Sequence, residues 1–280
     1  MKPEPRPRPA AAATAGGPEL GGPRYFIEDV YPAIDGGRFA VKRIIAEPIE
    51  VWADIFRDGH EVSAASLLWS REGETEWRRE PMRHFQNDRW AGSFTPTELG
   101  RHQYAIEAWT DAFATWRRDF LLKQEAGQPL DIEAAEASEL LAGARWGSKG
   151  AQEIIRAART AFEEGGDASV LLTEELAAAM AEAQPRSDLT WSRAFPLLIE
   201  RERARASAWY EIFPRSQSPV PGRHGTFDDC IARLPQIAGL GFDVLYFPPI
   251  HPIGRTNRKG RNNALTAAPD DPGSPYAIGA

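Results

Sequence analysis

Residues 209–279 read WYEIFPRSQSPVPGRHGTFDDCIARLPQIAGLGFDVLYFPPIHPIGRTNRKGRNNALTAAPDDPGSPYAIG. The stretch begins with a short apolar and aromatic run over residues 209–213. Residues 226–238 have the apolar spacing of a helix, and residues 243–247 are a second strand-like run that is closed by two prolines. The order strand, helix, strand predicts a βαβ unit with two parallel strands.

Two loop segments follow the expected strands, residues 214–225 and residues 248–280. In a parallel βα architecture the loops after the carboxyl ends of the strands build the active face. No carboxylate occurs from residue 248 to residue 263, although the whole chain has a formal net charge of -7. A local cationic loop in an acidic chain indicates an anionic ligand. The polar side chains of this basic loop are His251, Arg255, Arg258, Lys259, Arg261, Asn262 and Asn263.

Three runs within this stretch resemble one known family. They are HGTF (224–227), RLPQIAGLGFDVLYFPPIHPIGRTNRKGRNN (233–263) and DPGSPYAIG (271–279). They resemble the start of the catalytic barrel in bacterial maltosyltransferases that use maltose 1-phosphate to extend α-1,4-glucans, members of the α-amylase superfamily. The PPI run is common in that superfamily, whereas HPIGRTNRKGRNN is much more specific to the maltosyltransferases. Tyr276 stands where the family would have Trp, so an aromatic ring is kept.

The resemblance implies a (β/α)8 TIM barrel and a retaining transfer of maltosyl units to the non-reducing end of a glucan, with release of phosphate, in a route from trehalose to branched α-glucan. The implied partners are maltose 1-phosphate and an α-1,4-glucan acceptor, together with a second copy of the chain in a homodimer. No metal and no organic cofactor is implied. The side chains that match the family's donor contacts, or stand near them, are Lys259 as first candidate, then Asn262, Asn263, Arg255 and Tyr276. A solvated loop held by salt bridges is the competing explanation of the same charges.

The chemistry of such a transfer needs two carboxyl groups about 5 to 5.5 Å apart, one as nucleophile and one as acid and base. In the superfamily these follow the fourth and fifth barrel strands, and only two strands are recognisable here. The acidic pairs Asp228-Asp229 and Asp270-Asp271 are better explained by a helix first turn and by a solvated loop. We therefore assign no catalytic residue and expect this chain alone to be inactive.

Composition limits the other classes of function. Charged residues make up 26% and hydrophobic residues 42% of the 280 residues, as in an ordinary soluble globular protein. The acidic balance argues against a general nucleic-acid binder, which needs a broad basic face. Cys230 is the single cysteine, so no intrachain disulfide is expected, and it falls among the apolar positions of the expected helix. No membrane span and no signal peptide are predicted, so a cytoplasmic location is expected.

Four segments follow one another along the chain. Residues 1–23 are rich in proline and poor in large apolar side chains, which predicts a disordered tail. Residues 24–125 contain short runs of period two separated by turn-forming clusters, which predict an all-β immunoglobulin-like sandwich. Residues 126–206 are rich in alanine and glutamate with helical spacing, which predicts an inserted helical bundle that includes a helix over 195–206. Residues 207–280 are the expected beginning of the barrel.

The sandwich range leaves one functional question open. Six tryptophans in residues 24–125 either fill a small core or stack on sugars at the surface: Trp52, Trp69, Trp77, Trp90, Trp109 and Trp116. The histidines His60, His84 and His102 lack the spacing of metal ligands. Two further alternatives remain, an α-amylase-type hydrolase or branching enzyme, and a non-catalytic module for glucan binding or dimerisation. The last gains from the shortness of residues 207–280, because a complete barrel needs about 250 residues.

Overall fold

The computed structural model describes residues 24–165 and 168–277, so the expected disordered tail lies outside the described residues. The chain divides into two compact units, residues 1–199 and residues 200–280. Each unit is described by itself below.

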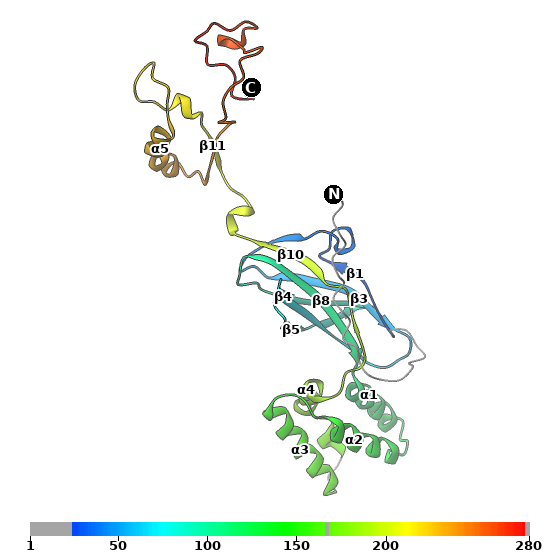
Figure 1. Ribbon diagram of the computed structural model, residues 1–280. Helices are drawn as coiled ribbons and strands as arrows, with labels where there is room; N and C mark the ends of the chain where they lie inside the picture. Colours follow the sequence, from blue (N-terminus) through cyan, green and yellow to red (C-terminus); the bar gives the residue numbers. More distant parts are fainter. Residues whose placement is uncertain (1–23, 166–167, 278–280) are drawn as a thin grey trace. The chain divides into compact units, whose positions relative to one another are not determined.

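Two β-sheets make up most of the first unit (Figure 1). The first sheet is antiparallel with the order β1 (Tyr25–Tyr31), β3 (Ile49–Arg57), β7 (Arg89–Phe94) and β6 (Arg83–Gln86). The second has the order β2 (Val41–Ile44), β10 (Phe195–Glu200), β8 (Gly100–Thr110), β4 (Ser63–Arg71) and β5 (Arg78–Pro81), and β9 (Ser187–Trp191) also pairs with β8.

The two sheets share one hydrophobic core. Along β3 the side chains alternate, with Val51, Ala53 and Ile55 buried and Trp52 partly exposed on the opposite face. This alternation is the period-two pattern of the sequence, so the strand predicted from it is confirmed for β3. Of the six tryptophans in question, Trp69, Trp90, Trp109 and Trp116 are buried, whereas Trp52 and Trp77 remain partly exposed.

Four helices lie between β8 and β9 in the chain: α1 (Ala112–Glu125), α2 (Asp131–Gly143), α3 (Lys149–Glu163) and α4 (Glu174–Ala183). They enclose a second core that includes Phe120, Leu141 and Met180. The start and end of this helical insert are tied together by Gln184. Its side-chain oxygen accepts from the Phe113 backbone N–H at 3.0 Å, and its amide donates to the Asp111 carboxylate at 2.7 Å.

The sequence prediction fails at both ends of the helical insert. The helix predicted over 195–206 is wrong, because Phe195–Glu200 is strand β10, in which Phe195, Leu197 and Ile199 are buried in the core between the sheets. Helix α1 begins at Ala112, inside the range predicted to be all β, where Asp111 caps it by accepting from the Ala114 N–H at 2.8 Å.

The second unit contains a strand, a helix and a strand, as predicted. Strand β11 (Trp209–Glu211) pairs in parallel with β12 (Val244–Tyr246), and α5 (Phe227–Gly239) lies between them in the chain. Ile212, Cys230 and Ile237 form a small core, so the predicted burial of the cysteine is confirmed. The described residues contain no closed barrel.

Within residues 24–165 and 168–277, no helix is long and apolar enough to cross a membrane. In the same ranges, no group of three or more His, Cys, Asp and Glu side chains is placed to hold a metal ion.

Candidate functional site

A pocket of about 450 Å3 lies in the second unit, between the segments that follow β11 and β12. Its walls come from residues 213–215, 224–227 and 248–253, and from Arg258, Pro272 and Pro275. Both wall segments follow the carboxyl ends of parallel strands, which is the position predicted for a site.

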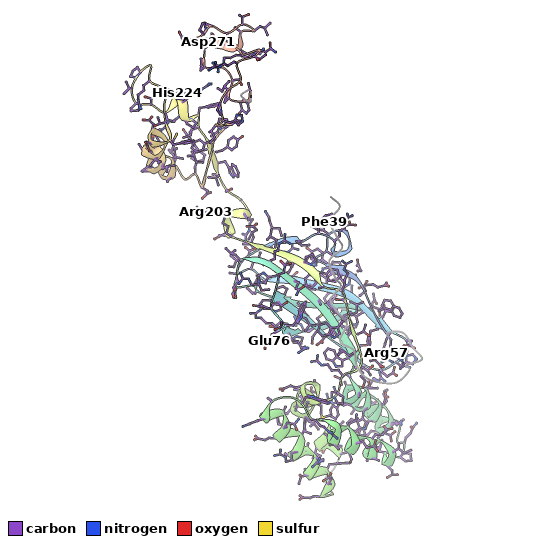
Figure 2. All side chains as sticks on the ribbon, viewed as in Figure 1. Phe39, Arg57, Glu76, Arg203, His224 and Asp271 are labelled. Carbon is purple, nitrogen blue, oxygen red and sulfur yellow. The ribbon has the colours of Figure 1, made fainter. Side chains whose placement is uncertain are left out.

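The first wall of the pocket, within residues 214–225, depends on close packing of Gly225 against the backbone of the same segment. Its N–H donates to the Arg215 carbonyl at 2.9 Å, which folds residues 214–225 back on themselves. A Cβ at Gly225 would lie 2.2 Å from the Pro214 carbonyl oxygen. Only glycine fits here without moving the backbone. The neighbouring His224 lines the pocket. Its side chain is labelled in Figure 2.

The charged side chains of the pocket lining are two arginines, which is why we call it the cationic pocket. Arg215, Arg258, His224 and His251 line it, and the described lining contains no carboxylate. Both guanidinium groups also bind the backbone. Arg215 donates to the Gly273 carbonyl at 2.9 Å, and Arg258 donates to the carbonyls of residues 253, 254 and 271 at 3.0 to 3.1 Å. These arginines hold the loop in shape and add positive charge, which suits an anionic ligand.

The predicted donor-binding residues are placed differently. Lys259, Asn262, Asn263, Arg255 and Tyr276 do not line the pocket. Lys259 is partly buried, and its ammonium group makes no hydrogen bond or ion pair to any other described residue. Asn262 and Asn263 have left-handed φ angles of 53° and 61°, so a turn requirement also explains these two asparagines.

Tyr276 lies at the surface near Glu211, at the end of β11. It is 60% exposed. Desolvation first, and then the Glu211 carboxylate, raise the pKa of the Tyr276 phenol.

Asp271 is the anchor of the basic loop. Its carboxylate accepts from the Ala268 N–H at 2.8 Å and from the Arg261 guanidinium at 3.2 Å. The residue, labelled in Figure 2, is only 8% exposed, so the prediction of a solvated acid is wrong at this position. The reason is that residues 260–271 fold into a closed loop in which Gly260 donates to the Ala264 carbonyl at 2.9 Å.

Sequence reasoning missed two of the four basic lining residues, Arg215 and His224. The signal was present, because residues 214–225 were one of the two segments expected on the active face and HGTF was one of the matching runs. Neither side chain was singled out, since the concentration of charge lies in the other segment.

Asp229 caps α5. Its carboxylate accepts from the Thr226 N–H at 2.8 Å, while the Thr226 hydroxyl accepts from the Asp229 N–H at 3.4 Å. The Thr226 N–H, and then the Arg223 guanidinium, hold the pKa of this carboxyl below its ordinary value. These capping contacts explain the acidic residue at position 229 without a catalytic role, in agreement with the prediction that Asp228-Asp229 belongs to the first turn of a helix.

The lowered pKa of Asp229 predicts a pH dependence. A carboxyl group with a folded pKa below its unfolded pKa contributes stability at pH values above the unfolded pKa, and that contribution is lost as the pH falls through the folded value. Hydrogen exchange of residues 227–239 will therefore accelerate below about pH 4, after correction for the intrinsic rate. Asp229→Asn will flatten this dependence; an unchanged profile in that variant would contradict the assignment.

Comparisons with known proteins cover most of the chain. Residues 23–201 match the family described as alpha-1,4-glucan:maltose-1-phosphate maltosyltransferase, domain N/S. Proteins of the same name are similar over about nine tenths of this chain. The one from Cereibacter sphaeroides is 47% identical over 262 residues, which is 91% of this chain and 39% of that protein. The one from Pseudomonas aeruginosa is 48% identical over 265 residues, 92% of this chain and 40% of that protein. The one from Chlorobaculum tepidum is 46% identical over 261 residues, 91% of this chain and 39% of that protein. The chain thus spans about two fifths of the length of these relatives.

Proposed function

The chain belongs to the alpha-1,4-glucan:maltose-1-phosphate maltosyltransferase family, and from that premise we propose that the protein carrying it transfers maltosyl units from maltose 1-phosphate to an α-1,4-glucan and releases phosphate. This activity is the one named for its relatives. The present residues contribute to recognition of the donor. The described pocket lining contains no carboxylate, so we assign no nucleophile and no acid or base to it.

The observation that carries the proposal is the cationic pocket with the basic loop beside it. A sugar phosphate brings negative charge and acceptor oxygens, and arginine and lysine are the side chains that bind such groups best. Arg258 belongs to both the pocket lining and the basic loop. The next residue, Lys259, has its ammonium group unpaired among the described residues, so no internal partner has to be displaced when a phosphate binds.

The finer architecture is part of the proposal. We take the two sheets as an immunoglobulin-like sandwich, the helices as an insert in it, and the second unit as the first βαβ portion of a (β/α)8 barrel. The supporting facts are the shared core of the two sheets, the position of α1–α4 between β8 and β9, and the parallel pair β11 and β12.

We further propose a cytoplasmic homodimer. Exposed apolar side chains on the helical insert, Leu121, Leu122 and Ile132, offer a surface for a second copy. Light scattering of the purified protein will give twice the mass of one chain. A monomeric mass at micromolar concentration would refute the dimer.

Lys259→Met tests donor recognition. In the complete enzyme this change will raise KM for maltose 1-phosphate roughly 10- to 100-fold, the loss expected for one charge-assisted hydrogen bond. The measurement is phosphate release at varied donor concentration. Lys42→Met is the matched control, because Lys42 is an exposed lysine on β2 of the other unit.

The same assay separates the alternatives. Unchanged kinetics in Lys259→Met would remove that lysine from the donor site. If the enzyme releases reducing ends from starch and no phosphate from maltose 1-phosphate, the transferase proposal fails and an α-amylase-type hydrolase takes its place.

A further inference from the structure

Two tryptophans, Trp191 exposed and Trp77 partly exposed, pack against each other on the first unit, whereas the cationic pocket belongs to the second. Trp191 ends β9 and is 46% exposed, and Trp77 lies in the loop before β5. Their ring centroids are 6.4 Å apart and the ring planes meet at 86°. Neither indole N–H has a hydrogen-bond partner among the described residues. Two large aromatic rings that both reach the surface, with their indole N–H groups free, are typical of a binding site rather than of a core.

The pair rests on a rigid base. Trp191 lies directly opposite Glu107 in the antiparallel pairing of β9 and β8. The Glu107 carboxylate is completely buried and is held by Arg79 at 2.6 Å and by Arg186. These charges satisfy one another, so the base positions the tryptophan without itself being free to bind a ligand.

A hollow of about 430 Å3 adjoins Trp77. It is lined by residues 73–78, and within it Glu74 and Arg78 form an ion pair at 2.9 Å. The Thr75 hydroxyl and the Glu76 carboxylate are exposed and make no hydrogen bond to other described residues. Glu76 is labelled in Figure 2, beside the two-sheet part. The hollow thus offers free groups that bind hydroxyls next to an aromatic ring.

We propose that this surface, Trp77, Trp191, Thr75 and Glu76, binds an α-1,4-glucan chain. The apolar faces of pyranose rings pack on indole rings, and two nearly perpendicular rings form a corner that follows a curved chain better than a flat platform does. The unpaired charge in the hollow is a carboxylate, which disfavours polyanions and accepts hydrogen bonds from sugar hydroxyls. The choice of glucan rests on the proposed transferase function.

The test is affinity electrophoresis of the 280-residue chain in native gels that contain soluble starch. The chain will be retarded in proportion to the starch concentration. Trp191→Ala and Trp77→Ala will each raise the apparent Kd about thirtyfold or more, as truncation of a central aromatic does in other binding sites. Trp191→Tyr will restore part of the retardation. Trp146→Ala is the matched control, because Trp146 is 57% exposed on the helical insert and will keep the wild-type mobility shift.

The electrophoresis result either supports or overturns the proposed glucan site. Absence of retardation in the wild-type chain, or equal retardation of wild type and the Trp77→Ala, Trp191→Ala double variant, overturns the site. Circular dichroism of both single variants will match wild type, and thermal unfolding of Trp191→Ala will too, because Trp191 is 46% exposed. If Trp77→Ala, which removes a partly exposed ring, is unfolded, Trp191→Ala and Trp191→Tyr carry the test.

The failure of this site is distinguishable from failure of the proposed function. In the complete enzyme the double variant will keep the rate of phosphate release with a short maltooligosaccharide acceptor within about twofold, and will lose rate only with long glucan. Starch retardation without any phosphate release from maltose 1-phosphate would leave this site standing and remove the transferase.

Discussion

Replacing Arg79 and Arg186 together by methionine will lower the free energy of unfolding of the first unit by about 3–5 kcal/mol, the usual result of leaving a buried charge without partners. Glu107 is 0% exposed, and these two arginines provide the ion pairs to its carboxylate that the described residues contain. Each single variant will lose less, because one guanidinium remains.

Urea denaturation followed by tryptophan fluorescence measures this loss, since eight of the nine tryptophans lie before residue 200. Adding Glu107→Gln to the double variant will recover part of the stability, because the stranded charge is then gone. The control is Arg71→Met, which breaks an ion pair to Glu98 whose side chains are about half exposed; it will cost less than about 1 kcal/mol. Equal losses in the control and in the double variant would show that the burial of Glu107 is not what matters.

Gly225→Ala will disrupt the wall of the cationic pocket. The added Cβ would stand 2.2 Å from the Pro214 carbonyl oxygen and under 3 Å from the N–H nitrogens of Ser218 and Gln217. All three neighbours are backbone atoms that cannot rotate away, so the change will cost the second unit about 1–3 kcal/mol or more. Hydrogen exchange measured by mass spectrometry over residues 209–247 will report the loss.

Gly239→Ala is the control in the same unit. Gly239 ends α5 with nothing within 4 Å of an added Cβ. Alanine there will leave the exchange rates unchanged or slow them, because alanine favours the helix by up to about 1 kcal/mol over glycine. In the complete enzyme, Gly225→Ala will also raise KM for maltose 1-phosphate, whereas Gly239→Ala will not. Wild-type exchange in Gly225→Ala would mean that the 214–225 segment is free to move.

The elements that the sequence predicted well have a strong periodic signal. Val51, Ala53 and Ile55 alternate with outward side chains in a run long enough to exclude a helix, and the Thr226 cap marks the start of α5. Strand β10 was missed because its six residues, FPLLIE, follow an alanine-rich stretch, and three apolar residues at alternate positions are too few to outweigh that context. Its pairing with β8, nearly a hundred residues away in the chain, is what makes it a strand.

The candidate site was predicted in its location and only partly in its residues. Composition shows that residues 248–263 are cationic, but it does not show which charges the loop uses internally. Arg258 binds three backbone carbonyls and Arg261 binds Asp271, and these contacts exist only once the loop has closed. The sequence also does not predict which side chains from residues 214–225 line the same pocket as that loop. Arg215 and His224 were therefore identified as lining residues only from the structure.

The bond between Gln184 and Asp111 has an evolutionary consequence. Because the first and last residues of the helical insert meet at one point beside β8 and β9, the insert closes on itself and places no demand on the length or order of the strands. Insertions and deletions between the two ends can then leave both sheets in place. Length differences among related proteins will therefore collect between residues 111 and 184, while the strands on either side keep their spacing.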